Sequence, residues 1–247
     1  MANFNFKDYQ IVLLGAIIAI GAIFSTALFT KGVIKYQKLQ NQTITVTGSA
    51  SENVTSDFAV LNFSYKTQAK DLKSGYNRMN SDKNKITEFL KEEGIKEDSI
   101  EFGQITNYEV NKRIGNFTTN EIDFYRFDSN VKVSSDNIKL ITDVSKKIDS
   151  LINRDVEIGY SNVQYFVSNL DDIKIKMVGE ATKNAKARAE SMVKSTNDKI
   201  GSLNSARMGV FQIVPVNSTE VSDYGINDTN SIEKKVVAVV NATFTVK

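Results

Sequence analysis

The chain has 247 residues, enough for one large domain or two small ones, and 31 basic against 29 acidic residues leave a net charge of only +2. Such a small net charge gives no strong electrostatic field, so we expect no nucleic-acid partner. The chain contains neither cysteine nor histidine, which excludes disulfides, thiol nucleophiles and Cys/His zinc sites. Carboxylate, lysine or serine–lysine chemistry is left open, and we expect no bound cofactor.

The N-terminal part of the chain is read as a tail over residues 1–8, a membrane anchor over 9–30 and a short polar linker over 31–42. No charged residue occurs from Tyr9 to Thr30. As a helix this stretch is about 33 Å long, enough to cross a hydrocarbon core of about 30 Å. A cleaved signal peptide is the alternative, because Ser25 and Ala27 fit a small-x-small cleavage rule. The length of the apolar run favours an uncleaved anchor.

The charges beside this anchor bear on its orientation. Lys31, Lys35 and Lys38 follow the apolar stretch, whereas only Lys7 precedes it, next to Asp8. The positive-inside rule would therefore place the folded part, residues 43–247, in the cytoplasm.

The apolar periodicity of residues 43–247 predicts an α+β fold: a mainly antiparallel sheet with helices packed on one face, preceded by one transmembrane helix. The predicted order is strand-strand-helix-strand-strand-helix-strand-helix-strand-strand. Strands are predicted at 43–47, 58–67, 100–110, 122–133, 156–167, 206–216 and 236–246, a turn at 48–51, and helices at 70–93, 136–153 and 171–200.

The helix predicted at 171–200 carries a stripe of small residues. Ala181, Ala185 and Ala189 recur at steps of four and so share one face of the helix. Small side chains permit a close approach, and strands are predicted on both sides of this segment. We therefore expect this face to lie against a sheet, and Gly201 to end the helix.

Two surface segments are candidates for contacts with other molecules. Gly115 and Asn116 suit the tip of a long hairpin, and exposed apolar side chains near a tip favour contacts between proteins. The oligomer contacts predicted there are Tyr108, Ile114 and Phe117. The polar stretch 217–235 is either an irregular surface connection or an arm that orders on assembly.

Several motifs occur together in a recognisable order. The opening ITVTGSASENVTSDFA carries Ile44, Val46 and Gly48 in an I-x-V-x-G pattern, while Ala50 and Ser56 stand where a second glycine and a proline are usual. The other motifs are a Gly94–Ile95 junction before a strand, a strand around Tyr125 that leads into a helix, the segment YFVSNLDD before the alanine-bearing helix, and a valine-rich last strand.

In this order the motifs resemble the SIMPL domain family over roughly residues 43–247. The resemblance implies an exported or envelope-associated protein, in some members linked to stress resistance and in some assembled into large ring-like or channel-like oligomers. It implies no catalytic residues. It also favours an extracytoplasmic position for the folded part, opposite to the positive-inside rule, and a domain of this size can be translocated despite modest flanking charge.

Acidic pairs and a basic helix side are the remaining candidate sites. Paired carboxylates could act as acid and base, but adjacent residues at helix ends diverge, and alternating charges indicate a solvated face. No phosphate loop, nucleophile elbow or calcium loop is present. The pairs are Glu92 with Glu93, Asp171 with Asp172, and Glu121 with Asp123; the basic side comprises Lys174, Lys183, Lys186 and Arg188.

Three functions are therefore considered. The first is a non-enzymatic, self-assembling envelope scaffold or stress-related interaction protein. The second is a monomeric tethered module that binds a small apolar or peptide ligand between the sheet and the alanine-lined helix. The third is an enzyme that uses carboxylate or serine–lysine groups, and the residue inventory argues against it.

Overall fold

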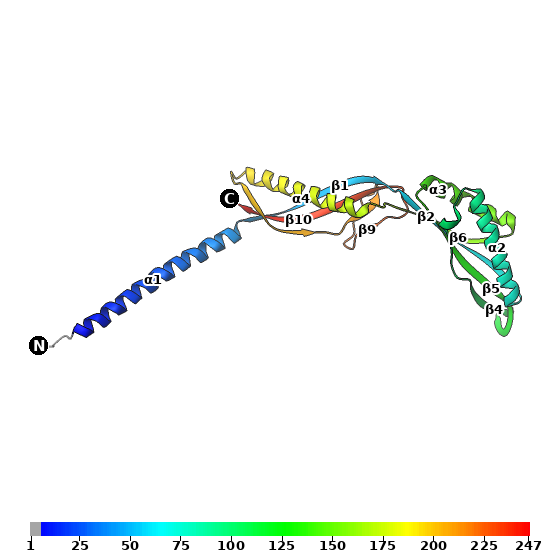
Figure 1. Ribbon diagram of the computed structural model, residues 1–247, viewed down its shortest axis with the longest axis horizontal. Coiled ribbons are helices and arrows are strands. Elements are labelled where there is room, and N and C mark those ends of the chain that lie inside the picture. The colour runs from blue at the N-terminus through cyan, green and yellow to red at the C-terminus, as the bar shows by residue number, and fades with distance from the viewer. Residues whose placement is uncertain (1–5) are drawn as a thin grey trace. The chain divides into compact units, whose positions relative to one another are not determined.

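The computed structural model describes residues 6–247, and side chains at 13–36 and 42–247. It confirms the α+β class, with antiparallel-rich sheets, helices and an N-terminal apolar helix (Figure 1). The chain forms two compact units. Unit 1 comprises the chain up to Ala50 together with Val178–Gly209 and Val239–Lys247, and unit 2 comprises Ser51–Met177 and Val210–Ala238.

The helices and strands follow one another in this order: α1 (Phe6–Asn41), β1 (Thr43–Thr55), β2 (Phe58–Ala69), α2 (Leu72–Glu92), β3 (Ile100–Phe102), β4 (Thr106–Ile114), β5 (Phe117–Ser135), α3 (Ile138–Lys147), β6 (Glu157–Phe166), α4 (Leu170–Lys194), β7 (Ile200–Met208), β8 (Gln212–Pro215), β9 (Ile226–Asn227) and β10 (Glu233–Val246). Short 3-10 helices, η1 (Glu97–Ser99) and η2 (Ile148–Arg154), precede β3 and follow α3.

α1 contains the predicted membrane anchor. Its stretch Leu13–Tyr36 is long and apolar enough to cross a membrane, with a mean hydropathy of 2.2, and none of it is buried against the rest of the described chain. The helix continues to Asn41, and β1 begins at Thr43. The segment read as a polar linker is therefore largely helical, because it contains neither proline nor a run of turn-forming residues.

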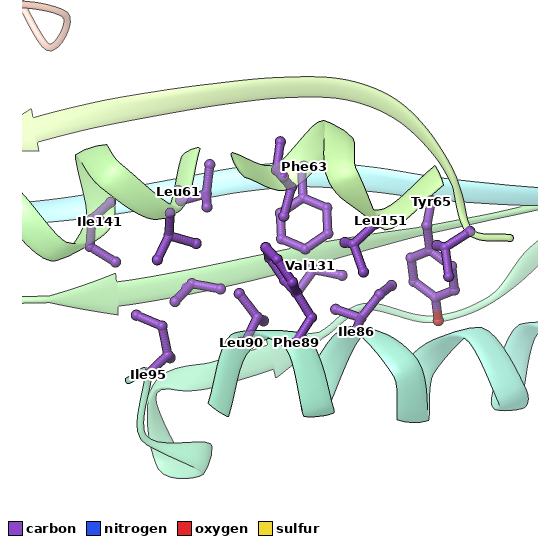
Figure 2. Packing of buried hydrophobic residues seen from close by; sticks show 14 of the residues in the cluster. Leu61, Phe63, Tyr65, Ile86, Phe89, Leu90, Ile95, Val131, Ile141 and Leu151 are labelled. Atoms are coloured by element: carbon purple, nitrogen blue, oxygen red, sulfur yellow. The ribbon is translucent and has the colours of Figure 1, made fainter. Parts of the chain in front are cut away.

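Unit 2 contains a five-stranded sheet in the order β3-β5-β2-β6, with β4 also paired to β5. β2 and β5 are antiparallel from Ala59 opposite Ser135 to Ala69 opposite Tyr125. Because side chains alternate along a strand, β2 directs every second residue into a core beneath α2 and α3. Figure 2 shows this core, whose buried members include Leu61, Phe63, Ile86, Leu90 and Ile141.

The helices over this sheet begin and end at residues suited to those positions. Asp71 caps α2 by accepting a hydrogen bond from the Ser74 amide at 2.9 Å, and Gly94 ends that helix with a φ of 91°. Asn137 caps α3 by accepting from the Leu140 amide at 3.0 Å. These caps satisfy donors that the first turn of a helix leaves unpaired.

Unit 1 is built on β10, which hydrogen-bonds to β1 and, on its other edge, to β7. The β7 pairing is antiparallel and runs from Val240 opposite Met208 to Val246 opposite Ile200. Alternate β10 residues, among them Val240, Ala242 and Phe244, are buried.

Several predicted boundaries differ from the structure. Residues 48–51 continue β1 instead of turning, because its pairing with β10 overrides their small-residue composition. The long helix ends at Lys194 and not at 200, and the chain turns at Asn197, whose φ is 63°. Gly201 therefore lies in β7. The predicted strands 100–110 and 206–216 are each divided in two, and the single predicted sheet is two five-stranded sheets.

Candidate functional site

The alanine stripe of α4 lies against β1 within unit 1. Ala181, Ala185 and Ala189 are fully buried. Opposite them, Gly48 approaches α4 so closely that a β-carbon added to it would lie 2.2 Å from the Ala181 carbonyl oxygen and 2.4 Å from the Ala185 amide nitrogen. This face is therefore filled by the protein's own backbone, and no ligand fits where the binding-module hypothesis placed one.

The tip of the β4–β5 hairpin is an exposed apolar feature of unit 2. Ile114 and Phe117 face each other across the tip, on either side of Gly115, which has a φ of 60°. Their exposed fractions are 63% and 80%. A largely exposed aromatic side chain beside an exposed aliphatic one lowers solubility and indicates a contact surface.

The base of the hairpin is held by polar contacts. The Arg126 guanidinium lies 5.6 Å from the centre of the Tyr108 ring and donates to the Tyr108 hydroxyl at 3.2 Å. The Asn107 side-chain amide donates to the Tyr76 hydroxyl at 3.1 Å, which ties the hairpin to α2. Tyr108 is 46% exposed, so the three predicted contact residues all reach solvent, with Tyr108 nearer the base and the other two at the tip.

A buried carboxylate on α2 organises a second polar cluster. Asp82 is 1% exposed, and the Arg78 Nε lies 3.2 Å from its Oδ1 without hydrogen-bond geometry, while the Lys85 Nζ lies 3.9 Å away. Both cations also donate to carbonyl oxygens at the end of η2, of Asp155 and Arg154 respectively, at 2.6 Å. Burial raises the pKa of Asp82 despite these two cations. The cluster ties α2 to η2.

A buried lysine lies at the start of β10. Lys234 is 1% exposed, and its Nζ donates to the Asp228 carbonyl. Burial lowers the pKa of Lys234. The Asp228 carboxylate is itself partly buried, which raises its pKa, but hydrogen bonds from Ser231 and the Asn230 amide hold that pKa below its ordinary value. Its Oδ2 is buried without a hydrogen-bond partner.

Further hydrogen bonds order part of the segment 217–235. Lys235 donates to the Ser218 carbonyl at 2.8 Å, and Gln212 exchanges two hydrogen bonds with the Ser222 backbone. β9 lies within the segment, and β10 begins at Glu233. Val221 and Tyr224 are nevertheless 82% and 97% exposed. The segment is therefore a structured connection with exposed apolar side chains.

Ion pairs occupy most of the acidic and basic candidates. A carboxylate already held by a cation on the surface is a structural group. The pairs are Glu92 with Arg154, Glu93 with Lys147 at 2.5 Å, Asp171 with Lys174 at 3.0 Å, Glu121 with Lys112 at 3.7 Å, Asp123 with Lys70 at 2.9 Å, Lys183 with Glu180 at 2.8 Å, and Lys186 with Glu190 at 3.8 Å.

One polar hollow in unit 2 has the size of a ligand pocket. It has a volume of about 600 Å³ and lies beside the first turn of α3. Its lining includes Phe58, Lys96, Ser134, Ser135 and Asn137. In the part of the chain that the structure describes, no group of three or more acidic side chains could hold a metal ion.

Sequence reasoning missed Asp82, Lys234 and the close approach at Gly48. Asp82 lies three residues after Met79 and four before Ile86, on the buried face of α2, and this position was the available signal. Lys234 lies in strict alternation with the buried Val236 and Ala238 of β10. Gly48 was interpreted as part of a motif and as the start of a turn at 48–51, not as a point of close approach.

Comparisons with known proteins bear on the identity of the chain. A search of curated proteins finds no match. The sequence model of the SIMPL family, described as "Protein of unknown function (DUF541)", matches residues 44–244, which is most of the chain. The match starts in β1 and ends in β10, so it covers both units beyond α1. The chain therefore belongs to the SIMPL family.

Proposed function

We propose that this protein is a membrane-anchored, extracytoplasmic and non-enzymatic scaffold that assembles with copies of itself. The observation that carries the proposal is the exposed apolar tip of the β4–β5 hairpin, Ile114 with Phe117, on a chain that also has an apolar membrane-length helix. An anchor confines copies to one surface and so raises their effective concentration, which lets a small contact suffice for assembly.

An extracytoplasmic position is supported by composition. A chain without cysteine cannot form wrong disulfides in an oxidising compartment. Lys31 and Lys35, directly after the apolar stretch, favour the opposite orientation. A few positive charges beside a span do not, however, prevent a domain of this size from crossing the membrane.

The absence of cysteine makes the orientation directly measurable. A single Ser222→Cys substitution in the intact chain introduces one reactive thiol beyond the anchor. We expect a membrane-impermeant maleimide to label it in intact cells. Labelling that requires lysed cells would contradict the extracytoplasmic position.

Self-assembly is tested by the mass of the intact chain in a mild detergent, measured by light scattering over a concentration series. We expect a discrete assembly larger than a monomer. The variant Ile114→Ser/Phe117→Ser should have a smaller mass, because it removes the apolar tip, and Leu203→Ser, a matched exposed apolar residue on β7, should have the same mass as the unmodified chain. A monomeric unmodified chain would exclude the scaffold.

A tethered binding module is the second candidate, because the polar hollow beside α3 could admit a small ligand. Phe58 supplies an apolar wall, whereas Lys96 and the two serines supply polar groups. A ligand bound there would raise the thermal unfolding midpoint in proportion to its concentration and affinity. Loss of that shift in Lys96→Ala, at unchanged midpoint without ligand, would assign it to this hollow.

A further inference from the structure

β4 is an edge strand with an open side. It is hydrogen-bonded to β5 along one edge, and no other described strand pairs with it. All its residues are exposed except Val110, which is half-buried. The pairing of β4 with β5 contains two irregularities, and in both of them the extra residues lie in β5. Successive side chains of β4 therefore still point to opposite faces of the sheet.

The exposed residues of β4 have an internal symmetry about Asn111. Glu109 lies two residues before it and Arg113 two residues after it, and neither forms an ion pair with any side chain described at 13–36 and 42–247. Tyr108 and Ile114, both exposed, lie three residues before and after it. A strand with this pattern complements a second copy of itself in the antiparallel direction.

We propose that two copies of the chain join β4 to β4 as antiparallel strands about a two-fold axis at Asn111. In this register, Glu109 of each copy faces Arg113 of the other, and Tyr108 of each copy faces Ile114 of the other. Opposite charges and aromatic–aliphatic pairs directly across two strands stabilise a sheet. A two-fold axis makes each contact twice, and the sheets of the two copies become continuous.

The other edge strands lack this complementarity. Among the described edges, β1 carries Glu52 as its one charged residue, β6 carries Glu157 and β7 carries Arg207. The short edge strands β3 and β9 carry one charged residue, Glu101, and none. A strand with one charge cannot place opposite charges across a two-fold axis. β6 is also partly covered, because the Tyr165 amide donates to the Thr229 carbonyl. Of the edge strands compared, β4 is therefore the one whose charged residues can pair with those of a second antiparallel copy.

This inference rests on the proposed self-assembly, because it names the strand through which two copies meet. It goes beyond the tip contact, since it assigns the register and the pairs of residues. A strand from an unrelated protein would have no reason to share the symmetry about Asn111.

The test is a charge exchange in the intact chain in mild detergent. Glu109→Arg places two positive pairs across the axis, and Arg113→Glu places two negative pairs, so we expect the mass of either assembly to fall to half or less. Mixed together, the two variants face each other with opposite charges at both pairs, and the assembly should form again. The double variant E109R/R113E should assemble alone.

The controls separate pairing from folding. Arg207→Glu reverses a charge on the edge strand β7 and should leave the mass unchanged. The thermal midpoints of both single variants should match that of the unmodified chain, because neither residue has an ion pair to lose. If the unmodified chain assembles but both single variants keep its mass, β4 pairing is overturned and self-assembly stands. If mixing fails to restore the mass, the register is overturned. A monomeric unmodified chain overturns both proposals.

Discussion

Gly48 lets β1 approach α4 more closely than any side chain would permit. The three atoms nearest to an added β-carbon all belong to the backbone of Ala181 and Ala185, so no side-chain rotation could relieve the overlap. We expect Gly48→Ala to lower the free energy of unfolding by about 1–3 kcal/mol, as overpacking does. Gly179→Ala, on α4 with no atom within 4 Å of its added carbon, should raise it by about 0.5–1 kcal/mol through helix propensity.

Urea unfolding of both glycine variants checks this pair. Equal effects of the two substitutions would contradict the close approach at Gly48. Equal slopes of free energy against urea concentration would show that the variants differ in stability and not in the surface exposed on unfolding.

Asp82 makes stability depend on pH in an unusual direction. Because burial raises the pKa of its folded carboxyl, the folded chain binds this proton more tightly than the unfolded chain. The protonated Asp82 carboxyl therefore stabilises the folded chain. This stabilisation is fully present below the ordinary carboxyl pKa of about 3.9 and is lost as pH rises through the raised pKa of the folded state. Relative to Asp82→Asn, the unmodified chain should therefore lose stability as pH rises from about 4 toward 7.

Urea titrations of both proteins at several pH values measure this difference. A difference between the unmodified chain and Asp82→Asn that stays constant with pH would contradict the raised pKa.

At the scale of elements, the sequence predicts those whose burial follows a clear period. β2 and β5 alternate cleanly, and α2 and α3 carry regular apolar faces, so their existence and order could be read from the residues. β7 could not, because IGSLNS has neither strict alternation nor many β-branched residues. Its strand geometry comes from pairing with β10, a contact distant in sequence.

The candidate contact surface, too, could be predicted from the sequence only in part. The hairpin tip was predictable from Gly115–Asn116 between strands, and its apolar residues from their position. The division of the chain into two units was not, because β1, α4 and β10 each contribute residues to both. A continuous strand carries no local signal that its two ends join different cores.

Lys234 fixes the segment that precedes β10. Replacing it with methionine removes the donor to the Asp228 carbonyl and leaves the Asp228 carboxylate without its nearby positive charge. We expect Lys234→Met to speed amide hydrogen exchange at Asn230 and Ser231, which donate to that carboxylate, by a local destabilisation of about 1–3 kcal/mol.

The neighbouring lysine offers the control for this measurement. Lys235→Met removes a donor to the Ser218 carbonyl, at the other end of the segment. It should leave exchange at the Asn230 and Ser231 amides unchanged. Equal exchange rates in Lys234→Met and the unmodified chain would contradict the ordering role of Lys234.

At the scale of the whole molecule, an apolar membrane-length helix precedes a SIMPL domain, and the edge strand β4 of that domain has a self-complementary charge pattern. In the proposed assembly, the anchor restricts the copies to a shared surface, and β4 supplies the contact. A single pair of strands gives a small interface, and confinement to a membrane offsets that weakness. Assembly should therefore be stronger in a bilayer than after removal of α1.

Cysteine cross-linking in membranes tests the β4 contact most directly, because the chain has no native cysteine. In the two-fold register Asn111 faces itself, so Asn111→Cys brings two thiols within the distance that a disulfide spans. Under mild oxidation we expect a reductant-sensitive dimer from Asn111→Cys and little from Ser202→Cys on β7. A monomeric Asn111→Cys chain, or equal cross-linking at both positions, would contradict the account.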